Sequence, residues 1–238
     1  MSLFSAADES AHYALSVAML LQQYRTQLGW EREGIVELGT GDAVAMAAIV
    51  AAVPTLRVHG FDISEPSVSQ ARRNIAARGV ADRYRVELGD FFDQSDSTGG
   101  PTATTVVSNP PYIPAPDRDI LMPELWGGPA GNAPMLQLLK AGYDHVIAAV
   151  ASYSDPATTL ATASDLGYRV ANFLVTGLDF GAYSLEPKVA AQIRGLCAEG
   201  RGWADENGYL VGVALFTRNA DVPGDRAAQL LASLQRPR

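Results

Sequence analysis

The sequence predicts a single α/β domain with a doubly wound, mostly parallel seven-stranded sheet. Short apolar runs rich in β-branched residues alternate with helical patterns, which calls for such a sheet. The first of these runs is followed by a glycine turn and a helix. The 238 residues, 47% hydrophobic and 18% charged, suit one globular α/β domain with a sizeable core.

The first 33 residues are expected to form a helical extension of the main domain, which spans 34–238. An amphipathic helix is predicted from about Ala6 to Leu28, and Gly29 ends it. The apolar run 34–38 then predicts a strand. The Ala-rich run 43–53 predicts a helix that Pro54 ends, since proline cannot continue a helix.

Later elements follow the same alternation. The run 56–61 is a predicted strand ending at Asp62, and Ser64-Glu65-Pro66 opens a helix to about Arg78, because proline is tolerated in a first helical turn. A helix is expected after Asp155-Pro156 and another at 189–197. The remaining predicted strands are 83–88, 104–108, 145–152, 168–175 and 210–217. The last pairing is expected to include an antiparallel edge strand. Polar, glycine-rich or proline-rich composition predicts loops at 93–101 and 113–134.

Charge and composition exclude several classes of protein. Eighteen basic and 26 acidic residues give a net charge of −8, and no basic cluster exceeds Arg72-Arg73, so attraction to nucleic acid should be weak. The absence of a signal peptide or a long apolar run predicts a cytoplasmic protein without membrane association. One cysteine and three scattered histidines predict no metal site. The oligomeric state is left open.

Four successive predicted strands end in polar residues, and these are expected to line one ligand-binding edge of the sheet: Glu37, Asp62, Asp90 and Asn109. The turn Gly39-Thr40-Gly41 allows close approach of a ligand to backbone N–H groups. Val44 stands where a dinucleotide fingerprint has its third glycine, which disfavours a pyrophosphate. Asp62 is placed to accept from ribose hydroxyls, and together these features indicate a nucleoside ligand. The alternative for Asp62 is a helix cap.

Asp90 and Phe91 suit an adenine ring, with the carboxylate accepting from the exocyclic amine and the ring covering one face. Their alternative is a turn acid and a core phenylalanine. Asn109 ends a strand because Pro110 and Pro111 lack N–H donors. The segment Asn109-Pro110-Pro111-Tyr112 then presents a polar amide at the ligand edge, unless it is an ordinary proline-rich turn.

The order of these motifs resembles class I S-adenosylmethionine-dependent methyltransferases. The chain is most similar to the protein-(glutamine-N5) methyltransferases that modify release factors, whose N-terminal helical recognition domain it is expected to lack. The similarity covers about 34–140, and Ala43 replaces a glycine usual in the first motif. The segments that carry it are Glu37-Leu38-Gly39-Thr40-Gly41, Phe61-Asp62-Ile63-Ser64, Gly89-Asp90, Ser108-Asn109-Pro110-Pro111-Tyr112-Ile113-Pro114 and the glycine-rich Leu125–Gly131.

This resemblance implies an S-adenosyl-L-methionine site with Glu37 near the methionine portion. The other implied cofactor-site residues are Gly39, Thr40, Gly41, Asp62, Ile63, Asp90, Phe91 and Asn109. It further implies that Asn109 and the Pro110 carbonyl hold the target nitrogen while Tyr112 packs on the planar group. Pro111, Tyr112 and Trp126 would line the acceptor site.

The function that follows is N-methylation of a planar amide or amine nitrogen in a protein, peptide or small metabolite. Methylation of adenine N6 or guanine N2 in RNA or DNA is an alternative, against which the acidic charge argues. A non-catalytic nucleoside-binding module is the other alternative, and the intact segment Asn109-Pro110-Pro111-Tyr112 argues against it.

Overall fold

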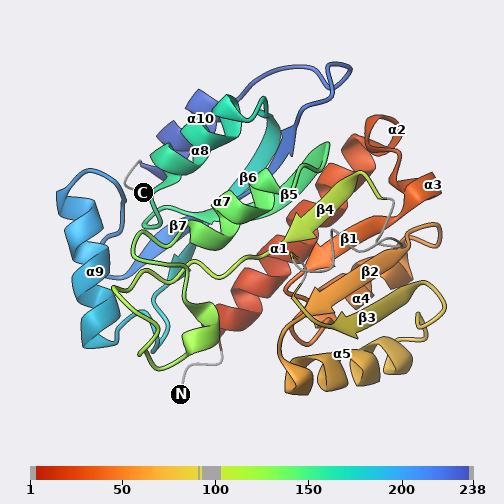
Figure 1. The fold of residues 1–238 in the computed structure, drawn as a ribbon, viewed down its shortest axis with the longest axis horizontal. Coiled ribbons are helices and arrows are strands. Elements are labelled where there is room, and N and C mark those ends of the chain that lie inside the picture. Colours follow the sequence, from red (N-terminus) through yellow and green to blue (C-terminus); the bar gives the residue numbers. More distant parts are fainter. Residues whose placement is uncertain (1–3, 91, 93–102, 236–238) are drawn as a thin grey trace.

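The protein is built around one seven-stranded sheet in the order β3-β2-β1-β4-β5-β7-β6 (Figure 1). The computed structural model describes residues 4–90, 92 and 103–235. The strands are β1 (Ile35–Leu38), β2 (Val58–Asp62), β3 (Tyr84–Leu88), β4 (Thr105–Ser108), β5 (His145–Ala151), β6 (Arg169–Asp179) and β7 (Gly208–Thr217). Each overlaps one of the seven predicted strands, and β6 continues to Asp179, beyond its predicted end at 175.

Strands β1 to β5 pair in parallel, whereas β7 runs antiparallel to both β5 and β6. The predicted fold class, a doubly wound and mostly parallel sheet with antiparallel pairing at one side, is therefore confirmed. Strand β7 enters between β5 and β6, so β6 forms that edge of the sheet. A register shift between Val170 and Asn172 marks a bulge in the edge strand.

Helices cover both faces of the sheet (Figure 1). Residues of α1 (Phe4–Gln23), α4 (Val44–Ala52) and α5 (Glu65–Ala77) pack in one core cluster, together with α9 (Pro187–Ala198). Residues of α7 (Ala133–Lys140), α8 (Pro156–Asp165) and α10 (Ala227–Leu234) pack in the other. Neighbouring residues Ile35 and Val36 belong to different clusters because successive side chains of a strand point to opposite faces.

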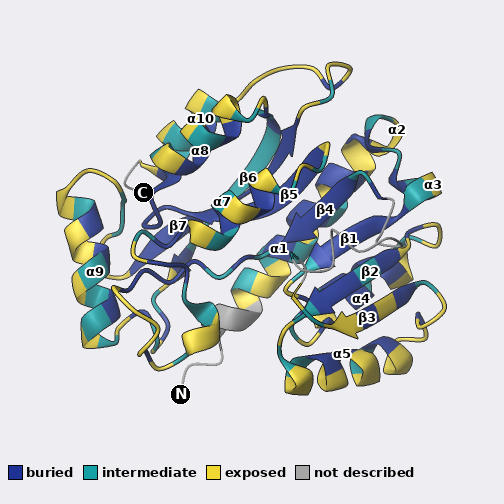
Figure 2. Cartoon of the chain, in the orientation of Figure 1, coloured by how far each residue is buried: buried dark blue, intermediate teal, exposed yellow. Residues whose placement is uncertain are grey.

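The sheet interior is buried on both sides, as Figure 2 shows for its central strands. Every residue of β5 and of β7 is buried. This burial explains why the strands are continuous apolar runs without polar alternation. Within the described part of the chain, every helix is too short or too polar to cross a lipid bilayer.

The predicted single helix 6–28 is wrong, because the helix breaks at Tyr24. Helix α1 ends at Gln23, and α2 (Arg25–Leu28) and α3 (Trp30–Glu33) follow. The Leu21 carbonyl, which a continuous helix would pair with the Arg25 N–H, accepts from Trp30 Nε1 at 2.9 Å. Burying the Trp30 indole thus redirects the chain. The division into an extension at 1–33 and a domain at 34–238 stays a prediction.

The two predicted loops differ in what the structure shows. The segment 93–101 lies outside the described residues. The segment 113–134 contains the short 3-10 helix η1 (Pro123–Leu125), and α7 begins within it at Ala133.

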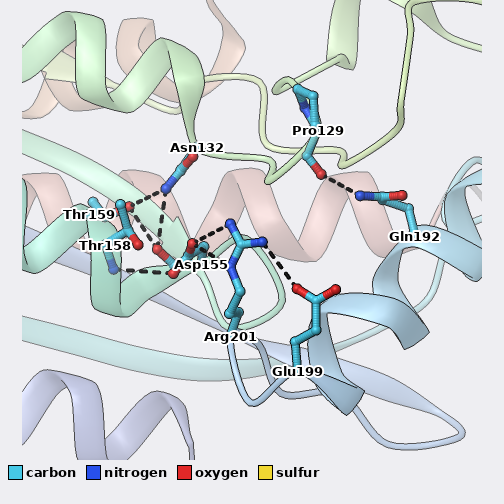
Figure 3. Close-up of polar contacts among 8 residues, drawn as sticks. All are labelled: Pro129, Asn132, Asp155, Thr158, Thr159, Gln192, Glu199 and Arg201. Carbon is cyan, nitrogen blue, oxygen red and sulfur yellow. Dashed lines mark hydrogen bonds and ion pairs between the residues drawn. The ribbon is translucent and has the colours of Figure 1, made fainter.

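A polar network ties the end of this loop to α8 and to the α9 region (Figure 3). Asn132 Nδ2 donates to the Asp155 carbonyl at 3.3 Å, and Gln192 Nε2 donates to the Pro129 carbonyl at 2.8 Å. The Asp155 carboxylate caps α8 by accepting from the Thr158 N–H and pairs with the Arg201 guanidinium at 2.8 Å. Its side chain is 2% exposed, so Arg201 supplies the charge that this carboxylate needs.

Arg201→Gln should lower the free energy of unfolding by about 1–3 kcal/mol, because it leaves a buried carboxylate without its cation. This cost is smaller than for a fully buried ion pair, because Arg201 itself is 46% exposed. Urea unfolding measures the change. Arg194→Gln, on the exposed face of α9, is the matched control and should alter stability by less than about 0.5 kcal/mol. Equal effects of the two substitutions would contradict the role given to Arg201.

Candidate functional site

The parallel register brings the ends of four strands to one edge of the sheet. Leu38 pairs with both Phe61 and Ser108, and Asp62 pairs with Leu88. The predicted site residues that follow these strands therefore begin at the same level. Strand β1 lies between β2 and β4, so the chain reverses its winding direction there. Ligands of open α/β sheets bind at such a switch point.

The glycine turn after β1 borders open space. Gly39 and Gly41 have left-handed φ values of 70° and 59°, and apart from their chain neighbours no atom of the described residues lies within 4 Å of a Cβ built on either. Ala43 also has a positive φ, 60°, at a position where glycine would be less strained. The backbone here is thus shaped as a tight turn with room for a ligand above it.

Asp62 braces this turn. Its Oδ2 accepts from the Gly41 N–H and its Oδ1 from the Ser64 N–H, both at 2.8 Å. The cap of α5 is Ser64, which accepts from the Ser67 N–H at 3.4 Å. The helix-cap alternative for Asp62 is therefore not realised. Each carboxylate oxygen retains a further lone pair for a ligand hydroxyl.

Glu37 is a buried carboxylic acid beside the turn. It is 4% exposed, accepts from the Tyr84 hydroxyl and contacts Thr40, which is also buried. Burial raises the pKa of Glu37 to about 7, with smaller effects of the Asp62 and Asp42 charges in the same direction. No salt bridge among the described residues neutralises it. A buried acid that has no cationic partner and lies at this edge of a sheet is typical of a residue that binds a ligand or takes part in catalysis.

The predicted adenine site is described in part. Asp90 Oδ1 accepts from the Phe92 N–H at 2.9 Å, whereas Phe91 lies outside the described residues. Ile63 is 69% exposed and Leu88 is 50% exposed, and both stand at the carboxyl ends of paired strands. These apolar side chains at a polar edge could cover a flat ring.

The Asn109 amide is held from one side only. Asn109 Nδ2 donates to Glu9 Oε1 of α1 at 2.6 Å. Asn109 Oδ1 is buried, and no residue that the structure describes donates a hydrogen bond to it. A buried carbonyl oxygen without a donor is costly, which marks it as a candidate acceptor for a ligand N–H.

Tyr112 lies in an aromatic cluster rather than in open space. Its side chain is 8% exposed, its hydroxyl lies 3.0 Å from the Tyr209 hydroxyl, and its ring contacts the rings of Tyr153 and Tyr209. Phe180 stacks on Tyr153 and Tyr209 in the same cluster. Burial raises the pKa of the Tyr112 hydroxyl well above its ordinary value, so it stays protonated and able to donate.

The glycine-rich segment packs directly on the Asn-Pro-Pro-Tyr segment. A Cβ on Gly127 would lie 2.7 Å from the Tyr112 Cα, and one on Gly131, whose φ is 77°, would lie 2.6 Å from the Tyr112 carbonyl oxygen. The Gly127 N–H donates to the Ile113 carbonyl at 2.8 Å. Glycine is therefore required here by close backbone approach, a physical reason for the spacing of the two segments.

Trp126 is half-buried and fixed to this loop. Its Nε1 donates to the Ala115 carbonyl at 2.9 Å, and the Arg118 guanidinium lies 5.0 Å from its ring centroid. Pro110 is buried, and Pro111 is half-buried. The roles of these three residues toward an acceptor stay predictions.

Glu9 was not among the predicted site residues. It lies four residues before the buried Tyr13 and so on the buried stripe of α1, which continues through Val17 and Leu20. A carboxylate on an apolar helical stripe is the signal that could have indicated it.

Comparisons with known proteins agree with this geometry. Residues 35–126 match the family model described as a methyltransferase domain. Release factor glutamine methyltransferases of Chlorobaculum tepidum and Thermosynechococcus vestitus are 37% and 29% identical over 38% and 49% of this chain. These matches cover 31% and 43% of the two relatives, so the chain spans under half the length of the curated relatives it matches.

Solved structures support the fold. A candidate RNA methyltransferase from Pyrococcus horikoshii matches 84% of this chain and 82% of its own with a TM-score of 0.52 and 16% identity. A candidate sarcosine dimethylglycine methyltransferase from Galdieria sulphuraria covers 85% of both chains with a TM-score of 0.51 and 13% identity. At these identities the similarity concerns the fold alone.

The sheet topology defines a Rossmann-like fold of the kind that methyltransferases share. The family match covers the glycine turn and the strands that follow it, so residues 35–126 are assigned to a class I S-adenosylmethionine-dependent methyltransferase domain. The predicted cofactor class and the resemblance to release factor glutamine methyltransferases are confirmed at this level.

Replacing Glu37 by Gln should change how stability depends on pH. The folded-state pKa near 7 exceeds the ordinary value of 4.5, so the native state favours the protonated acid. The stabilising contribution of Glu37 to the free energy of unfolding is fully present below about pH 4.5. It is lost as the pH rises through about 7, and the loss amounts to roughly 3 kcal/mol. Glu37→Gln removes this loss. Thermal unfolding between pH 5 and pH 8 measures it.

The control is Glu65→Gln, in the exposed first turn of α5, which should keep the pH dependence of the parent chain. Parallel stability profiles of Glu37→Gln and the parent would show that Glu37 does not titrate in this range.

Proposed function

We propose that this protein is an S-adenosylmethionine-dependent N-methyltransferase that acts on a planar amide or amine nitrogen of a protein, peptide or small metabolite. The observation that carries the proposal is the Asn109 carbonyl oxygen, which is buried and lacks a donor among the described residues. It lies at the switch point of a sheet whose neighbouring turn belongs to a methyltransferase domain. An acceptor nitrogen with an N–H group would satisfy it.

The residues at the edge of the sheet fit the cofactor. The space over Gly39 and Gly41 leaves room for it, and the buried Glu37 carboxylate complements an ammonium group. Asp62 has lone pairs left for ribose hydroxyls, and Ile63, Asp90 and Phe91 would hold the adenine. Thr40 and Asn109 complete the proposed site. When bound, S-adenosylmethionine supplies a methyl group already activated by a sulfonium.

The protein's part in the reaction is positioning. Asn109 Oδ1 and the Pro110 carbonyl would accept the N–H groups of the acceptor and so direct the nitrogen lone pair at the methyl group. The prolines fix the backbone that presents both oxygens. Tyr112, Pro111 and Trp126 would enclose the planar group and exclude water.

A glutamine side-chain amide is the acceptor that the named relatives suggest first. An acceptor in RNA or DNA is less well supported, since the net charge of −8 opposes binding to a phosphate backbone. The substrate of the whole protein stays a proposal, because the chain spans less than half of those relatives.

Calorimetry with S-adenosylmethionine and with NAD tests the proposed cofactor site. Binding is expected for S-adenosylmethionine alone, because Val44 replaces the third glycine that a pyrophosphate-binding turn requires. A preference for NAD would overturn the proposed function.

Asn109→Ala should lower methyl transfer by about 100-fold while cofactor affinity changes by only a few fold, since the substitution removes a contact that orients the acceptor. The measurement is transfer of a radiolabelled methyl group to protein, nucleic-acid and small-molecule fractions of the source organism. Asn207→Ala, at an exposed position, is the control. Turnover that survives in Asn109→Ala would show that Asn109 does not bind the acceptor.

A further inference from the structure

Helix α1 contacts the Asn-Pro-Pro-Tyr segment. Glu9 of α1 accepts from Asn109 Nδ2 at 2.6 Å, across 100 residues of sequence. The same carboxylate also interacts with the Tyr112 side chain, whose hydroxyl lies 3.0 Å from the Tyr209 hydroxyl. Glu9 therefore contacts both polar side chains of the Asn-Pro-Pro-Tyr segment.

This contact decides which way the Asn109 amide faces. An ionised carboxylate only accepts hydrogen bonds, so the amide must present Nδ2 to Glu9. Asn109 Oδ1 then points away from Glu9, and it is buried and has no donor among the described residues. Without a fixed partner, the two ends of an asparagine amide could exchange places by rotation about the last side-chain bond.

We propose that Glu9 is a positioning residue for methyl transfer, which holds the Asn109 amide so that its Oδ1 faces the acceptor nitrogen. The inference rests on the proposed function of Asn109. It also narrows the acceptor to nitrogens that carry at least one hydrogen, such as a primary amide, because only these can donate to Oδ1. Groups that orient a functional side chain by a hydrogen bond can contribute about 10- to 100-fold, as the outer partners of metal ligands do.

The surroundings of Glu9 make its protonation state important. Burial raises its pKa, and it faces Asn109 and Tyr112 from the segment after β4, Tyr153 from the segment after β5, and Tyr209 from β7. Burial also raises the pKa of these three tyrosines, so they stay neutral at pH values where Glu9 titrates. His12, one turn along α1, has a pKa lowered by burial.

A protonated Glu9 becomes a donor and could bond to Asn109 Oδ1, which would turn the amide around. Methyl transfer should therefore fall as the pH decreases through the raised pKa of Glu9. If the Glu9 carboxylate instead occupied the place of an acceptor carbonyl, it would block the site. The two roles predict opposite effects of removing the charge.

The first measurement is the side-chain amide signal of Asn109 in ¹⁵N-asparagine-labelled protein, identified by its loss in Asn109→Ala. In the parent chain this signal should shift with pH as Glu9 titrates. Glu9→Gln, which keeps the shape of the side chain, should abolish the shift, and Asp8→Asn on the exposed side of α1 should retain it. A signal that does not titrate in the parent, or that titrates unchanged in Glu9→Gln as it would through His12, overturns the inference.

The second measurement is methyl transfer to whichever extract fraction of the source organism the parent chain labels. Glu9→Gln should lower kcat by about tenfold and flatten its acidic pH limb, with cofactor affinity unchanged. Full or increased activity of Glu9→Gln overturns the positioning role. If Asn109→Ala is inactive in that case, the proposed function stands without the inference, whereas an active Asn109→Ala removes the proposed function itself.

Discussion

The register of β1 with its two neighbours is the constraint on which the site depends. Leu38 is level with Phe61 on one side and with Ser108 on the other, so the turn after β1, Asp62 and Asn109 begin at one height. Burial on both faces fixes this register, because a slip by one residue would exchange the faces of Ile35 and Val36. Apolar packing throughout the sheet thereby sets the position of polar groups at its edge.

The edge retains two carboxylates that packing alone would not favour. Glu37 is buried beside the glycine turn, and Glu9 is directed at the Asn-Pro-Pro-Tyr segment. Burial raises the pKa of both, and no salt bridge within the described ranges involves either of them. A buried acid costs stability unless it is paired, and sites that bind or react are where such groups collect. One lies on the side proposed for the cofactor and the other on the side proposed for the acceptor.

Local patterns were enough to predict the strands and the edge of the sheet at which Glu37, Asp62 and Asn109 follow one another. β-branched runs and the glycine and proline signals between them fix β1 to β5, and parallel pairing then brings Glu37, Asp62 and Asn109 together. Contacts between distant residues could not be predicted in the same way. The bond from Trp30 to the Leu21 carbonyl breaks the first helix, and the bond from Asn109 to Glu9 joins that helix to the site. Periodicity places Glu9 on the buried stripe of its helix, but only the folded chain shows which group it meets.

The two sides of the site come from different parts of the chain. The turn after β1 and Asp62 lie within residues 35–126, which match the methyltransferase domain. The groups around Tyr112 come from outside that match: Glu9 precedes it, and Tyr153, Phe180 and Tyr209 follow it. The Asp155–Arg201 pair that supports the adjoining loop also lies beyond it. Similarity over the matched segment therefore carries information about the cofactor and about the motif that would bind nitrogen, whereas the surroundings of Tyr112 are formed by residues outside that segment. The chain and its relatives could therefore share the methyl-transfer chemistry while they differ in the acceptor.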